Sequence, residues 1–173
     1  PVFADLLDEN PKNAMYAELL GRTCTVLTEG NQPQCTTLTA YAQQHPRDAI
    51  LATYAATSIL HQPADSGQLE VARHLLAAAI RANPDLPEAR YGMGLLLQTE
   101  SAWAKSIPEL EAAIRLRPEY ASAHYRLAMA LSHTGQHEQA RAEIALQQKY
   151  NQQEQAGVDA RLKQVTTFLV NMQ

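Results

Sequence analysis

Four short segments of this chain end in the same way, each with a large apolar residue eight positions before a proline. The prolines are Pro11, Pro46, Pro84 and Pro118, at intervals of 35, 38 and 34 residues. The apolar residues are Phe3, Leu38, Leu76 and Leu110. A period of this length is typical of arrays in which one small unit recurs and buries its apolar side against the next copy. The recurrence therefore predicts a stacked array.

Each unit has the pattern of two helices. In the fourth unit, Tyr125 and Ala128 belong to one apolar row with a period near 3.6, and Ala140 and Ile144 begin a second row. Gly135 stands between the two rows, and glycine supplies the positive φ that a tight interhelical turn favours. No stretch keeps the two-residue alternation of a β-strand, so the pattern predicts helical hairpins throughout.

The last unit lacks its proline. A fifth proline would fall at Gln152, although Ile144 still occupies the apolar place eight residues earlier. Beyond it, a helix of roughly 154–171 would carry one apolar face, formed by Val158, Leu162, Val165, Leu169 and Met172. Because an array must cover the open edge of its last unit, we interpret this segment as a capping helix. A dimerisation helix or a ligand-mimicking helix is the alternative.

These units resemble the tetratricopeptide repeat. The resemblance rests on Met93, Gly94, Leu97, Trp103, Ser106, Leu110 and Pro118 in the third unit, and on Leu127, Ala128, Leu131, Gly135, Ala140 and Ile144 in the fourth. It implies an all-α, right-handed α-solenoid of about four helical hairpins. The expected segments are 1–12 as the tail helix of a truncated upstream repeat, 13–46, 47–84 with a turn insertion, 85–118 and 119–151 as four repeats, and 152–173 as the capping helix.

The resemblance also implies a function. Arrays of this family bind a partner protein or a peptide segment in a concave groove lined by the first helix of each repeat. By position, the candidate groove residues are Arg22, Tyr54, Tyr91, Leu95, Gln98, Tyr125, Arg126 and Met129. The subset that grips a chaperone's C-terminal carboxylate needs a Lys/Asn/Lys/Arg set, which only Arg126 matches here. A self-association or assembly module of a larger polypeptide is the alternative.

The net charge and the absence of certain motifs argue against other classes of protein. A net charge of −4 without a basic stripe argues against nucleic-acid binding, and no apolar run approaches the ~20 residues that span a bilayer. Nucleotide, hydrolase and zinc-protease motifs are absent from the sequence, so we expect no enzyme and no cofactor. A metal-binding or enzymatic domain that uses histidines is the least favoured alternative. His133 and His137 are four apart, but Gly135 interrupts the helix between them, so structural roles are expected.

The two cysteines, Cys24 and Cys35, belong to opposite helices of the first hairpin. A bridge across the turn is feasible, and two reduced core thiols are the alternative. No CxxC motif is present to suggest a metal site. A bridge would indicate an oxidising compartment, which favours an exported protein of the periplasm or the extracellular space.

Overall fold

The computed structural model describes Met15, residues 19–21 and 23–24, and residues 33–170, and every regular element among them is an α-helix. The helices after residue 32 are α3 (Pro33–Gln44), α4 (Ala49–Leu60), α5 (Ser66–Ala82), α6 (Pro87–Thr99), α7 (Trp103–Leu116), α8 (Ala121–His133) and α9 (His137–Val170). The predicted all-α fold is confirmed. The predicted tail helix of 1–12 lies outside the described residues.

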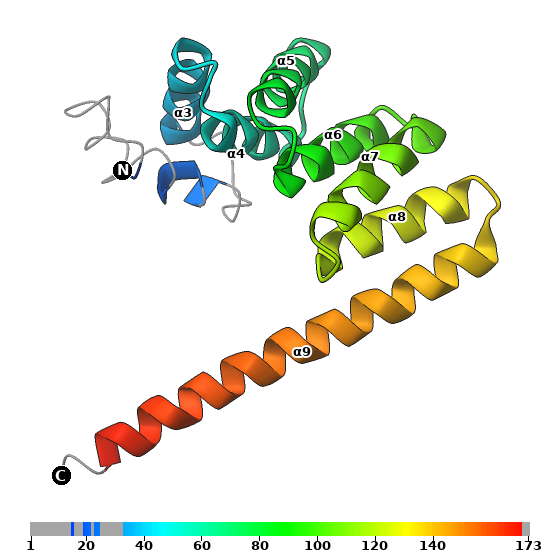
Figure 1. The fold of residues 1–173 in the computed structure, drawn as a ribbon. Helices are drawn as coiled ribbons and strands as arrows, with labels where there is room; N and C mark the ends of the chain where they lie inside the picture. Colours follow the sequence, from blue (N-terminus) through cyan, green and yellow to red (C-terminus); the bar gives the residue numbers. More distant parts are fainter. Residues whose placement is uncertain (1–14, 16–18, 22, 25–32, 171–173) are drawn as a thin grey trace.

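The helices form a curved array of antiparallel hairpins, α4 with α5, α6 with α7, and α8 with α9 (Figure 1). Consecutive first helices are also in contact, α4 with α6 and α6 with α8. The first helices therefore line the inner side of the array, and α5 and α7 lie on its outer side (Figure 1). This is the predicted right-handed α-solenoid.

The leucines that precede the prolines form the centre of the packing. Leu38, Leu76 and Leu110, one on each second helix, are completely buried. A β-carbon on Gly92 of α6 would lie 2.6 Å from the Leu76 side chain, and one on Gly94 would lie 2.6 Å from that of Leu110. Helix α6 thus receives a leucine from the preceding unit and another from its own unit. Close-packed interiors of this kind leave little room for added atoms.

Side-chain caps set the start of two helices. The Asp48 carboxylate accepts a hydrogen bond from the Leu51 amide at 3.0 Å at the start of α4. At the start of α5, Asp65 and Gln68 form a reciprocal capping box. The connection between these helices, residues 61–65, is longer than the three-residue connections 100–102 and 134–136.

The C-terminal segment differs from the prediction. A separate capping helix over 152–173 is wrong, because α9 runs without interruption from His137 to Val170. Residues 151–162 are all exposed, so this stretch does not cover the edge of the array. The physical reason is the missing proline, since Gln152 neither removes an amide nor clashes with the preceding turn. Gly157 lowers helix stability by only about 1 kcal/mol, which does not end the helix.

The disulfide between Cys24 and Cys35 joins the first described helical segment to α3, with the two α-carbons 5.8 Å apart. Both residues are buried, at 1% and 7% exposure. Of the two alternatives left open by the sequence, the structure therefore has the bridge. It fixes the hairpin at the N-terminal end of the described array.

Two interhelical turns use the same hydrogen bonds with different residues. After α8, Gly135 has φ 81°, its amide donates to the Ser132 carbonyl at 3.2 Å, and the Gln136 amide donates to the Leu131 carbonyl at 2.8 Å. This is a Schellman motif. After α6, the amides of Ser101 and Ala102 donate in the same pattern, to the carbonyls of Gln98 at 2.9 Å and Leu97 at 2.8 Å. Ser101 there has φ 60°.

We predict that Ser101→Gly stabilises the array by about 0.5–1 kcal/mol, because a β-carbon is strained in the left-handed region and glycine is not. The matched change Gly135→Ser should destabilise it by a similar amount. No atom lies within 4 Å of a β-carbon at Gly135, so that effect would come from the backbone alone. Urea unfolding followed by circular dichroism measures both. If the free energy of unfolding changes in the same direction in both variants, strain from a β-carbon in the left-handed region is not the cause.

For the disulfide, we predict that replacing both Cys24 and Cys35 by alanine lowers stability by about 3 kcal/mol. The estimate comes from the loop-closure entropy for a sequence separation of 11. Unfolding curves should be recorded with and without a thiol reductant. Reduction should bring the original chain to the stability of the variant and leave the variant unchanged; a chain that is indifferent to reductant would refute this role.

Candidate functional site

Three tyrosines from successive hairpins gather on the inner side of the array. Tyr54 lies on α4, Tyr91 on α6, and Tyr120 immediately before α8. The rings of Tyr91 and Tyr120 are tilted by 37°, with their centroids 5.1 Å apart. Tyr54 is close enough to Tyr120 to influence its ionisation. We call these three residues the tyrosine row.

The first described helical segment packs directly against this row. A β-carbon on Gly21 would lie 2.5 Å from the β-carbon of Tyr54, a separation that no side chain could tolerate without movement. The glycine therefore allows the backbone of the first hairpin to approach the ring. The tyrosine row is continuous with the packing between units, and each of its rings is partly buried.

A charged pair adjoins Tyr120. The guanidinium carbon of Arg117 lies 4.8 Å from the centre of the Tyr120 ring, within cation–π range. Arg117 also forms an ion pair with Glu88 at the start of α6. Burial is the main factor that raises the pKa of the Tyr120 phenol, with smaller contributions from Tyr91, Glu88 and Tyr54, and Arg117 opposes the rise. The phenol is therefore held in its neutral, hydrogen-bonding form.

Tyr125 and Arg126 of α8 are the more accessible candidates. The Tyr125 residue is 45% exposed. Arg126 is partly exposed, and its guanidinium forms no hydrogen bond or ion pair with any residue in the described part of the chain. The Arg126 carbonyl, by contrast, accepts a hydrogen bond of 2.7 Å from Nε2 of Gln98. The two side chains thus lie on a helix whose backbone is hydrogen-bonded to the neighbouring helix α6.

The structure places three of the predicted groove residues elsewhere than on the accessible surface of the groove. Leu95 is 4% exposed and Gln98 is 5% exposed, so neither can contact a ligand in the groove. Gln98 donates to the Arg126 carbonyl and so joins α6 to α8, whereas Leu95 belongs to the buried core that α6 shares with the preceding helices. Met129 is partly buried in a cavity between α8 and α9 and not beside the tyrosine row. Arg22 lies outside the described residues.

Tyr120 was not among the predicted residues, although the sequence contains a signal for it. Asp48, Leu86 and Tyr120 each lie two positions after a repeat proline, and each is the N-cap residue of the next first helix. From this position the Tyr120 ring reaches Tyr91 on the first helix of the preceding unit.

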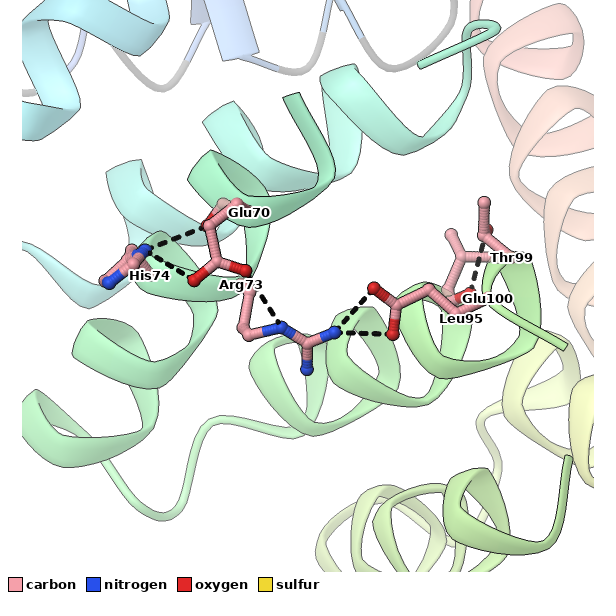
Figure 2. A network of polar contacts seen from close by, with 6 residues as sticks. All are labelled: Glu70, Arg73, His74, Leu95, Thr99 and Glu100. Carbon is pink, nitrogen blue, oxygen red and sulfur yellow. Dashed lines mark hydrogen bonds and ion pairs between the residues drawn. The ribbon is translucent and has the colours of Figure 1, made fainter. Parts of the chain in front are cut away.

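A second polar cluster connects α5 to the end of α6. Figure 2 shows Arg73 extended toward Glu100, whose two carboxylate oxygens each lie 2.5 Å from Nη2 of Arg73. Glu70 lies 3.5 Å from Nε of Arg73, and Nδ1 of His74 lies 3.0 Å from the Glu70 carbonyl oxygen. The hydrogen bond to Glu100 is the main reason that the pKa of Arg73 is raised. We assign this cluster to the alignment of consecutive units, because its charges already satisfy one another.

The histidines have structural environments. His133 stacks on Trp103 with ring centroids 3.7 Å apart. His124 is buried, with Nδ1 2.6 Å from a Glu143 oxygen and Nε2 2.8 Å from the Pro118 carbonyl oxygen. No set of three His, Cys, Asp or Glu residues suited to a metal ion occurs within the described residues. Within the same residues, no helix is both long and apolar enough to cross a bilayer.

The stacked hairpins and their inner aromatic face define the class of the protein: a helical-repeat scaffold for protein–protein interactions. Sequence models of the tetratricopeptide repeat match residues 64–107 and 97–162. The chain belongs to the tetratricopeptide-repeat family, as its sequence pattern predicted.

Solved structures of MamA share the fold. A crystal structure of MamA superposes with a TM-score of 0.65 at 17% identity, covering 89% of this chain and 87% of the other. MamA AMB-1 gives a TM-score of 0.61 at 21% identity, with 81% and 80% covered. MamA MSR-1 gives a TM-score of 0.60 at 18% identity, with 87% and 86% covered. No curated protein sequence matches the chain.

We predict that Tyr120→Phe makes the array less sensitive to alkali. Because the pKa of Tyr120 is raised in the folded state, its stabilising contribution is complete below pH 10 and is lost as the pH rises further. Stability to urea, measured between pH 8 and pH 11, should fall less steeply in the variant. Tyr125→Phe controls for the loss of one hydroxyl. If stability falls with rising pH as steeply in Tyr120→Phe as in the original chain, the buried environment assigned to the Tyr120 phenol is wrong.

Proposed function

We propose that the inner face of the array binds an extended segment of a partner protein across the α4, α6 and α8 helices, without catalysing a reaction. The tyrosine row would form the floor of this site, and Tyr125 with Arg126 would form its accessible end. The observation that carries the proposal is the alignment of aromatic side chains from three successive units on one face. A row with this spacing suits a ligand that runs along the array.

The chemistry of the residues indicates the kind of segment. Tyrosine combines a large apolar ring with a hydroxyl and is enriched in protein interfaces. Arg126 has no acidic partner among the described residues, whereas Arg117 is already paired with Glu88. The guanidinium of Arg126 is therefore the group best suited to a carboxylate of the ligand. We expect a segment with apolar or aromatic side chains and an acidic residue near α8.

The proposal can be tested with peptides selected from a random library for binding to this chain. Tyr125→Ala combined with Arg126→Ala should weaken the binding of such a peptide by at least tenfold, because exposed Tyr and Arg side chains often dominate interface energies. Isothermal titration calorimetry measures the affinity. Circular dichroism should show unchanged helix content, since neither side chain belongs to the buried core.

A matched control uses the outer face. Arg115 of α7 is exposed, and Arg115→Ala removes the same charge as Arg126→Ala. This control should bind the peptide like the original chain. If the inner-face and outer-face variants bind equally well, the ligand does not lie in the proposed groove.

A further inference from the structure

A groove follows the edge of α8 and α9, the last hairpin that the structure describes (Figure 1). Its cavity of about 450 Å³ is lined by residues of these two helices. The floor is apolar and consists of Ala128, Met129, Ala140 and Ile144. At the corresponding edge of the preceding hairpin, α6 with α7, the next first helix packs, and that helix is α8. We call the surface on α8 and α9 the open-edge groove.

The preceding edge shows how a first helix is held in such a place. Nε2 of Gln98 on α6 donates a hydrogen bond of 2.7 Å to the carbonyl oxygen of Arg126 on α8. Trp103, at the start of α7, stacks on His133 of α8 with the ring centroids 3.7 Å apart. Ile107, one turn further along α7, packs against the core cluster to which α8 contributes its leucines. An amide, an aromatic ring and an aliphatic side chain therefore receive α8 at this edge.

In the open-edge groove, different residue types occupy the three equivalent positions. The two units are offset by 34 residues, so these positions hold Ser132, His137 and Arg141. All three are exposed and line the cavity, and no acidic residue is among the described residues that line it. Arg141 pairs with Glu138 at 2.7 Å, but both side chains are more than three-quarters exposed, so the pair is weak. The groove therefore has an apolar floor and a positively charged rim.

We propose that the open-edge groove binds one amphipathic helix of a partner protein, with its apolar side on the floor and acidic side chains beside Arg141. The helix takes the place on α8 and α9 that α8 takes on α6 and α7. A guanidinium can hold a carboxylate through two parallel hydrogen bonds, which suits Arg141 to this role. The site lies outside the inner face and accepts a helix, whereas the inner face is proposed to accept an extended segment.

The charges of the chain's own first helices argue against a second copy as the occupant. Helix α4 contains no charged residue, and α6 contains one acidic and one basic residue, Glu88 and Arg90. Helix α8 contains Arg126 and no acidic residue. None of the three would bring a net negative charge to Arg141, and α8 would bring a positive one. Charge complementarity therefore favours a helix from a different protein.

The first test uses two synthetic peptides of residues 119–134, the segment that packs on the preceding edge. One carries His133→Glu and the other His133→Lys. Because His133 stacks on Trp103, the equivalent side chain of a bound peptide would lie beside His137, one helical turn from Arg141. Fluorescence anisotropy at low salt should show that the original chain prefers the His133→Glu peptide by about fivefold or more.

Charge reversal in the protein should reverse this preference. In Arg141→Glu, the His133→Lys peptide should become the tighter ligand, a result that simple loss of folding cannot give. Arg161→Glu is the matched control, because Arg161 is also exposed on α9 but does not line the cavity. This control should keep the original preference. Equal affinities of the original chain for the two peptides would overturn the proposal.

The second test locates the bound helix. In a chain labelled at its methionine methyl groups, the His133→Glu peptide should shift the NMR signal of Met129 and leave that of Met93, which packs against the other core cluster. An unmoved Met129 signal would overturn the proposal. Sedimentation velocity of the chain alone gives a further check, since a mass that rises with concentration and falls when the peptide is added would assign the groove to a second copy. Arg141→Glu should bind the inner-face peptide normally, so the two sites can fail separately.

Discussion

The contact between a leucine and a glycine on α6 determines the rest of this structure. Leu76 approaches α6 from the preceding unit and Leu110 from its own unit, and each meets a glycine at a distance that leaves no space for a β-carbon. Two such contacts on one helix fix the separation and the angle between consecutive hairpins. The inner face is a consequence of that angle, because it determines how near α4, α6 and α8 lie to one another. The tyrosine row exists because this spacing repeats.

Ion pairs between the helices contribute less to the stability of this packing than the leucines do. Arg90 and Glu109 join α6 to α7 with a nitrogen–oxygen distance of 3.0 Å, and Arg73 and Glu100 join α5 to α6. All four side chains remain more than a quarter exposed, so each pair contributes little to stability. Their positions, however, allow only one alignment of the paired helices. The leucines supply the energy of stacking, and the charges help to select the register.

The repeat could be predicted from the sequence because its signal lies in packing residues. The spacing of the prolines identified Leu38, Leu76 and Leu110, and all three are completely buried. The candidate site could be predicted only in part, because a position on a first helix does not reveal whether the next helix covers it. Gln98, which bonds to α8, is such a covered position, and Leu95 is buried against the preceding helices. Burial by a neighbouring unit depends on side-chain volumes throughout the interface.

The end of the array shows why one substitution can change the form of a repeat protein. A proline at the end of a unit terminates one helix and starts the connection to the next. With Gln152 in that place, nothing in the local sequence reverses the chain, and α9 extends to Val170. The apolar residues that would close the array are then carried away from the edge they could cover.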